Sequence, residues 1–138
     1  MKQLFIDTNI ILDLLAKRPG FYASAAKLFT LADKGEVELS VSSLTFANTH
    51  YIIVKQEGKE KAVQILRDLE LIVDIIDFTG KIVRLALNDK DFKDFEDGLQ
   101  YYSALENGMA VIITRNQKDF KHSKLPVMNA DQFLKTIK

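Results

Sequence analysis

Short, uninterrupted apolar runs recur along this chain, and they constrain its fold more than any other feature of the sequence. They do not alternate between apolar and polar residues, as strands with one solvent-facing side do. A continuous apolar run bounded by turn residues is typical of a strand in a parallel sheet that is covered on both faces. We therefore expect strands at about 3–6, 37–41, 71–76, 110–113 and 126–128.

Amphipathic helices are expected between these strands, because apolar residues recur there at helical spacing. Thr79 is expected to cap one of them, and Ser42 or Ser43 another. The expected helices cover 8–17, 21–34, 42–56, 59–69, 79–88, 95–107 and 131–137, and a polar loop with one helical turn covers 114–120. The alternation predicts an α/β fold with a central parallel sheet. No repeat or linker interrupts the pattern, so we expect 1–138 to form a single domain.

Composition excludes several classes of protein and of site. Nineteen basic residues balance nineteen acidic ones, which argues against a strongly basic nucleic-acid binder but leaves room for a local phosphate-binding patch. The chain has no cysteine, so disulfides, thiolate metal sites and cysteine nucleophiles are excluded. We expect neither a signal peptide nor a membrane-spanning helix, and we expect a cytoplasmic location.

Polar side chains follow two of the expected strands at the point where each strand ends. Asp7 and Asn9 come directly after the first apolar run, and Thr114 and Asn116 come directly after the run at 110–113. In an open parallel sheet, sites form beyond the carboxyl ends of the strands, near the point where the strand order reverses. If these two strands are neighbours in the sheet, their polar side chains meet there.

Two further carboxylates are expected at the same edge of the sheet. Asp97 lies near the start of the helix that precedes the strand at 110–113, and Asp119 follows Asn116 by about one helical turn. Clustered carboxylates repel each other in a partly dry cleft, and a divalent cation offsets that repulsion. Oxygen-only ligands select hard ions such as Mg²⁺ or Mn²⁺, and such ions support hydrolysis of phosphodiester bonds by activating water.

Each of these acids also has an ordinary structural interpretation. Asp7 is a favoured type of helix N-cap, and the helix dipole stabilises an acid such as Asp97 in the first turn of a helix. Asp94 is itself a candidate N-cap for that helix. Asp13 is expected to be solvated or to pair with Lys17. Asn116 and Asp119 are candidates for satisfying only the local backbone of their loop.

Taken in order, four stretches resemble the PIN domain family of metal-dependent ribonucleases, which includes VapC-type toxins. The long third stretch, followed by a closing strand and helix, is more specific than the short motif "IDTN". The matching stretches are "FIDTNIILDLL" at 5–15, "VSSLTFANTHYII" at 41–53, "DFEDGLQYYSALENGMAVIITRNQKDF" at 94–120 and "LPVMNADQFL" at 125–134. The resemblance implies a three-layer α/β/α fold with a central sheet of about five parallel strands.

The resemblance also implies roles for particular residues. Asp7 and Asp97 match metal-binding aspartates of the family, and Asn116 stands where many members have an acid, with Asp119 as the nearest replacement. Asn9 and Thr114 match residues that orient ligands or substrate. One departure is Asn48, which occupies the place of a glutamate in many members and shares a helical face with Leu44 and Tyr51.

Two functions of different classes follow from these observations. The first is a Mg²⁺- or Mn²⁺-dependent endoribonuclease, with Asp119 or Glu96 as a further metal ligand and with Arg115, Lys118 and Lys121 along the RNA backbone. The resemblance implies an antitoxin protein and a homodimer as partners of such an enzyme. The second is a PIN-like module with weak or no catalysis that binds RNA or protein, which the amides Asn48 and Asn116 favour.

Overall fold

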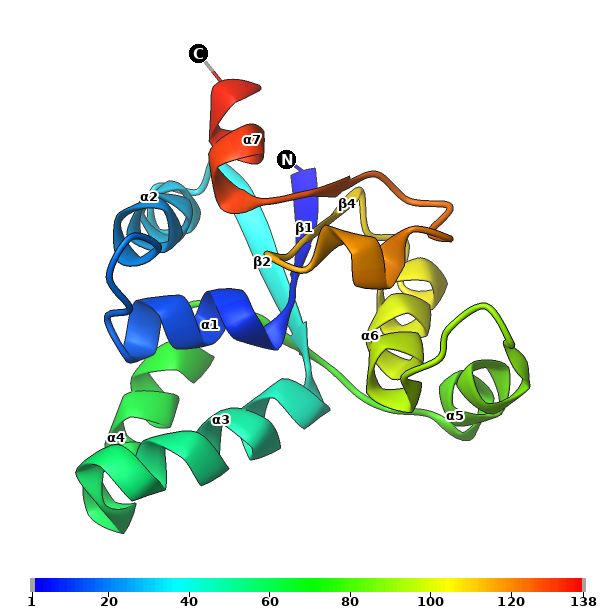
Figure 1. Cartoon of the computed structure of the whole chain (residues 1–138). Helices are drawn as coiled ribbons and strands as arrows, with labels where there is room; N and C mark the ends of the chain where they lie inside the picture. Colours follow the sequence, from blue (N-terminus) through cyan, green and yellow to red (C-terminus); the bar gives the residue numbers. More distant parts are fainter. Residues whose placement is uncertain (1, 138) are drawn as a thin grey trace.

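Five parallel strands form one sheet in the computed structural model of this protein, which describes residues 2–137 (Figure 1). The strand order is β3-β2-β1-β4-β5. The strands are β1 (Lys2–Ile6), β2 (Val37–Ser42), β3 (Asp74–Ile76), β4 (Val111–Ile113) and β5 (Val127–Met128). The number of strands and their parallel direction confirm the prediction from the apolar runs.

Seven α-helices and one short 3₁₀-helix connect or follow these strands within residues 2–137. The α-helices are α1 (Thr8–Leu15), α2 (Tyr22–Asp33), α3 (Ser43–Glu57), α4 (Lys59–Glu70), α5 (Gly80–Asn88), α6 (Phe95–Glu106) and α7 (Ala130–Lys135). The 3₁₀-helix η1 (Gln117–Phe120) is the single helical turn expected in the polar loop. In the part of the chain that the structure describes, no helix has the length and hydropathy needed to cross a bilayer.

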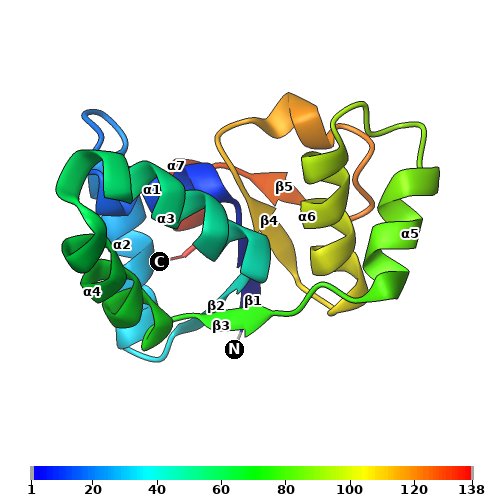
Figure 2. The same cartoon turned by 90° about the horizontal axis from the view of Figure 1, so that it is seen from below.

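Side chains on the two faces of the sheet pack into separate cores, because successive residues of a strand point to opposite faces. Leu4 and Ile6 of β1 pack in a core that includes residues of α1, α2 and α7. Phe5, between them, packs in a second core with residues of α6 and with Phe120. Figure 2 shows the sheet between these two groups of helices. The three-layer α/β/α fold is thereby confirmed.

The chain reverses its direction of travel across the sheet at β1. It moves outward from β1 through β2 to β3, and it then returns to place β4 and β5 on the other side of β1. Ile6 at the end of β1 is in register with Ile113 at the end of β4. The residues after these two strands therefore lie side by side at the switch point, where open α/β sheets bind ligands.

Several boundaries differ from the prediction for local reasons. β3 begins at Asp74 rather than Leu71, because the backbone N–H groups of Ile72 and Val73 both donate to Leu69 and prolong the turn after α4. α7 begins one residue early, because Asn129 and Gln132 form a reciprocal capping box. Thr79 caps α5 as predicted. Ser42 stands at the N-cap position of α3, but its hydroxyl makes no capping bond.

Candidate active site at the carboxyl edge of the sheet

Asp7 lies at the switch point, directly after β1 and beside the end of β4. Its backbone N–H donates to the carbonyl of Ile113 at 3.0 Å, and its side chain is 8% exposed. The N–H of Thr8 and the hydroxyl of Thr114 each donate to its carboxylate at 2.8 Å. Asp7 therefore caps α1, as the structural interpretation expected, and it also faces Thr114 across the switch point, as the functional interpretation required.

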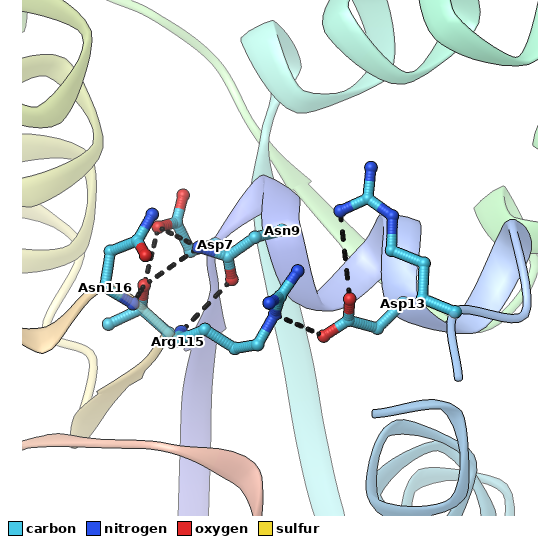
Figure 3. A network of polar contacts seen from close by, with 7 residues as sticks. Asp7, Asn9, Asp13, Arg115 and Asn116 are labelled. Carbon is cyan, nitrogen blue, oxygen red and sulfur yellow. Dashed lines mark hydrogen bonds and ion pairs between the residues drawn. The ribbon is translucent and has the colours of Figure 1, made fainter. Parts of the chain in front are cut away.

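The loop after β4 is joined to α1 by a network of hydrogen bonds around Asn9 (Figure 3), in which Thr114 also takes part. The amide of Asn9 donates to the hydroxyl of Thr114 at 3.2 Å and lies 3.4 Å from Asp7 Oδ2. Its carbonyl oxygen accepts the backbone N–H of Arg115 at 3.2 Å, and the N–H of Asn116 donates to the Thr114 hydroxyl at 3.0 Å. The structure thus brings together Asp7, Asn9 and Thr114, as the sequence predicted.

Gln100 is a site residue that the sequence reasoning missed. Its side chain is buried on α6, where its amide lies 3.3 Å from Asp7 Oδ1 and 3.2 Å from the hydroxyl of Thr45. Its carbonyl oxygen accepts the hydroxyl of Ser42, which explains why that hydroxyl does not cap α3. A polar residue one turn after Asp97, on the buried side of the helix, is the signal that could have identified it.

Asp97 lies in the first turn of α6, which begins where it does because Asp94 caps it by accepting the N–H of Glu96 at 2.8 Å. Its side chain is half-buried, and it shares a hollow with Asp7 that we call the acidic hollow. The polar residues that line the acidic hollow are Asp7, Thr8, Asn9, Asn48, Glu96, Asp97, Gln100 and Asn116, and Tyr51 also borders it. The two aspartates therefore face one space, although they come from distant parts of the sequence.

Asp119 lies in a neighbouring hollow rather than in the acidic hollow. This second space, which we call the lysine-rich hollow, contains Asp97 at its border with the first. Its lining combines the basic residues Lys90, Lys93, Lys118, Lys121 and His122 with the acids Asp91, Asp94, Asp97 and Asp119. Asp119 and Lys118 are exposed there. Asp7 and Asp119 thus line different hollows, and Asp97 lines both.

The carboxylates at this edge of the sheet raise one another's energy in the charged form by electrostatic repulsion. Burial raises the pKa of Asp97 to about 7, and the charges of Asp94, Asp119, Asp7 and Glu96 add to this shift. Burial also raises the pKa of Asp7, although bonds from Thr114, Thr8 and Gln100 oppose that effect. Both shifts disfavour the charged forms of the two aspartates. A cation in the acidic hollow would offset the repulsion and restore the charged forms.

The donor set of the acidic hollow fits a hard divalent cation. Its donors are carboxylate, amide and hydroxyl oxygens, which suit Mg²⁺ or Mn²⁺. The amides of Gln100 and Asn9 lie 3.3 and 3.4 Å from the carboxylate of Asp7, at the long end of the hydrogen-bond range. These weak contacts leave lone pairs of the carboxylate oxygens free to bind an ion. Within residues 2–137, no three acidic or histidine side chains are grouped closely enough to hold a metal alone. Two carboxylates completed by water and a phosphate match the usual coordination of Mg²⁺.

Asn48 and Asn116 line the acidic hollow from different elements of the fold. Asn48 is half-buried on α3, and Leu44 and Tyr51 line the same space, which confirms the helical face predicted for these three residues. Asn116 is exposed and borders the acidic hollow after β4. Both residues offer neutral oxygen and N–H groups where an acid would add charge.

The prediction for Asp13 is wrong, because the residue is neither solvated nor paired with Lys17. It is 1% exposed, and its carboxylate lies 2.9 Å from Arg115 Nε and 3.9 Å from Arg18 Nη1 (Figure 3). Arg115 Nε lacks hydrogen-bond geometry toward any described residue, so its contact with Asp13 is an ion pair. The guanidinium also lies 3.9 Å from the ring centre of Phe21. The structure thus directs the side chain of Arg115 toward α1 and α2.

The fold and this donor set define a class of protein: a doubly wound α/β/α protein with an oxygen-rich acidic site at its switch point. A sequence model of the PIN domain matches residues 3–118. The chain therefore belongs to the PIN domain family.

Several known proteins resemble the chain over most of its length. Ribonuclease VapC1 of Aquifex aeolicus (strain VF5) is 28% identical over 136 residues, which cover 96% of this chain and 93% of that protein. The structure of VapBC2 from Rickettsia felis, bound to a DNA fragment from its promoter, superposes with a TM-score of 0.71 at 24% identity, covering 92% of this chain and 98% of the other. A toxin–antitoxin complex from Klebsiella pneumoniae superposes with a TM-score of 0.70 at 21% identity, with coverages of 92% and 97%. The two structures share its fold.

Proposed function

We propose that this PIN domain is a ribonuclease that hydrolyses phosphodiester bonds in RNA with the help of Mg²⁺ or Mn²⁺. The observation that carries the proposal is the meeting of Asp7 and Asp97 in one acidic hollow at the switch point of the sheet. The similarity to a protein named Ribonuclease VapC1 over nearly the whole chain supports the same activity. An oxygen-only donor set supports a hard divalent cation as cofactor.

In this proposal, Asp7 and Asp97 hold the cation directly, and Glu96 or Asp119 contributes through water. The cation, when bound, supplies an activated water and offsets the negative charge of the reacting phosphate. Asp7 is kept in place by Thr114 and by the buried amide of Gln100, so its carboxylate loses little freedom when the ion binds.

The amide side chains of the acidic hollow position the substrate in this proposal. Asn116 and Asn48 both line the hollow and can donate N–H groups to phosphate oxygens. Lys118 and Lys121 extend the contact to phosphates further along the strand, because they line the adjoining lysine-rich hollow. Arg115 contributes mainly through its backbone, whose N–H orients Asn9, since its side chain pairs with Asp13.

We further propose that the chain acts as the toxin of a toxin–antitoxin pair. The fold it shares with VapBC2 and with the Klebsiella pneumoniae toxin–antitoxin complex supports a protein antitoxin as its partner. A homodimer is proposed on the resemblance to VapC-type toxins. A cytoplasmic location follows from an RNA substrate and a protein antitoxin.

Incubation of the purified protein with single-stranded and structured RNA tests the activity. We expect cleavage with Mn²⁺ or Mg²⁺, no cleavage with EDTA, and loss of cleavage in Asp97→Asn. Asp33→Asn is the matched control, because it makes the same substitution at an exposed carboxylate at the end of α2. Cleavage that survives in EDTA or in Asp97→Asn would refute the proposed role of the cation.

A second candidate function is a PIN-like module that binds RNA or protein without cleaving it. Two points favour it: Asn48 is neutral where the resemblance to the PIN family implies a glutamate, and residues 2–137 contain no group of three acidic or histidine side chains placed to hold a metal. Intact RNA under every metal condition, with a folded protein that still binds RNA, would establish the module and exclude the enzyme.

A further inference from the structure

Tyr51 is the most exposed aromatic residue among residues 2–137, with 64% of its surface accessible. It lies on α3, one turn after Asn48, and it lines the acidic hollow together with Asp7 and Asp97. A single exposed aromatic residue on a protein surface needs no special explanation. Tyr51 differs from that ordinary case because its ring borders the space in which the phosphodiester bond is proposed to be cleaved.

A lysine lies against one face of the Tyr51 ring. Lys55, one turn further along α3, places its Nζ atom 4.2 Å from the ring centre. The ring and the ammonium thus form a cation–π pair at the edge of the hollow. Because 64% of the residue remains exposed beside this lysine and the residue lines the acidic hollow, a flat ligand in the hollow can contact the side chain.

We propose that Tyr51 stacks on an unpaired base of the RNA and thereby positions the neighbouring phosphate over Asp7 and Asp97, an inference that rests on the proposed ribonuclease function. An unpaired base presents a free π-face, and stacking on an aromatic side chain is a common way of holding single-stranded RNA. Lys55 adds a positive charge for the backbone of the same nucleotide.

The neighbouring groups favour single-stranded RNA over a duplex as the occupant. In a duplex, the faces of the bases are covered by their stacked neighbours, so a protein ring at the surface cannot reach them. The lysine-rich hollow on the other side of Asp97 offers Lys118 and Lys121 to the phosphates. A strand that crosses both hollows would therefore contact an aromatic ring on one side of the aspartates and lysines on the other.

Steady-state kinetics on a short single-stranded RNA test the contribution of the ring to substrate binding. We expect Tyr51→Ala to raise KM about tenfold and to leave kcat nearly unchanged, because stacking that is equal in the ground and transition states contributes only to binding. Tyr51→Phe keeps the ring and is expected to stay within about twofold of the native protein. Leu87→Ala is the matched control, since Leu87 is 67% exposed on α5 and lines neither hollow.

The absence of tryptophan from the sequence allows a direct test of stacking. In Tyr51→Trp, the introduced indole is the only one in the protein, and we expect a single-stranded oligoribonucleotide to quench its fluorescence in EDTA, where the RNA stays intact. An abasic oligomer of equal length retains the phosphates and is expected not to quench it. Leu87→Trp provides the control for collisional quenching.

The outcomes separate this inference from the proposed function. If the native protein cleaves RNA but Tyr51→Ala has an unchanged KM, or if the abasic oligomer quenches Tyr51→Trp equally, the stacking role is overturned and the nuclease stands. If quenching requires bases but no RNA is cleaved under any metal condition, the base contact stands and the nuclease is overturned. If the fluorescence of Tyr51→Trp is quenched by raising the protein concentration without RNA, a second copy of the chain covers this face, and the inference is overturned.

Discussion

Replacing Asp97 by asparagine is expected to stabilise the metal-free fold while it abolishes cleavage. Burial and four neighbouring carboxylates raise the pKa of Asp97 from 3.8 to about 7. At about 1.4 kcal/mol per pKa unit, this shift corresponds to a destabilisation of the folded state of at most about 4 kcal/mol when Asp97 is ionised. Asp97 is only half-buried, so solvent screens part of that energy. Removing an acid from the first turn of α6 also costs a few tenths of a kcal/mol in lost interaction with the helix dipole. We therefore expect a net gain of about 1–2 kcal/mol at neutral pH.

The pH dependence identifies the source of this gain. Between about pH 4 and pH 7, the unfolded chain has released the proton of Asp97 while the folded protein retains it. The folded state then binds more protons, so the stability of the native protein falls as pH rises through this window. Asp97→Asn lacks that contribution, and its advantage should be absent below about pH 4 and complete above about pH 7.

Urea denaturation in EDTA measures both effects, with Asp33→Asn as the matched control. The midpoint for Asp97→Asn should exceed that of the native protein at about pH 7.5, and the two midpoints should converge at low pH. If the native protein and Asp97→Asn are equally stable at that pH, or if the advantage of the variant does not change with pH, then burial and neighbouring charges do not raise the pKa of Asp97. The inference of a shared cation would then lose its electrostatic basis.

Three other perturbations test separate parts of the structure. Gln100→Ala removes the buried amide that joins Asp7 to α3 and α6, and we expect a loss of about 1–3 kcal/mol in urea denaturation; an unchanged midpoint would refute this. Asp13→Ala leaves Arg115 without its buried partner, and a loss of about 2 kcal/mol is expected in the same assay, with no loss arguing against a structural pair. Saturating Mn²⁺, at about 100 times its Kd, should add about 2.7 kcal/mol to native stability in thermal denaturation but not to Asp97→Asn.

The strands and the polar residues at their carboxyl ends were predictable because their signals are local. The apolar runs at β1 and β4 are covered on both faces, and the polar residues after them have no place in such a core. The amino-acid sequence alone therefore places Asp7 and Thr114 at one edge of the sheet, and their carboxylate and hydroxyl oxygens lie 2.8 Å apart. The contact itself also requires β1 and β4 to be neighbours, which the sequence analysis stated only as a condition and which the structure shows.

Partners supplied by tertiary structure could not be predicted in the same way. Asp13 has a possible partner one helical turn away in Lys17, but the fold brings Arg115 to it and buries it. Gln100 resembles a surface residue by type, and only the packing of α6 against the end of β2 shows that its amide is enclosed. Both residues are polar groups whose burial is offset by distant partners.

The sequence also could not distinguish two adjacent hollows at one edge. Asp7, Asp97 and Asp119 were all expected there, and the charge of Asp119 contributes to the raised pKa of both Asp7 and Asp97. The 3₁₀-helix η1, however, directs Asp119 into the lysine-rich hollow, so that only Asp97 of the three borders both spaces. Separating neighbouring sites requires the course of a short loop, which depends on packing around Phe120 rather than on local spacing.

Anomalous diffraction from crystals of the protein soaked in Mn²⁺ tests the shared cation most directly. We predict one strong peak in the acidic hollow, within about 2.2 Å of a carboxylate oxygen of Asp7 and of Asp97, and its disappearance in Asp97→Asn. Manganese bound only elsewhere, or no peak at saturating concentration, would contradict the claim that these two carboxylates hold one ion.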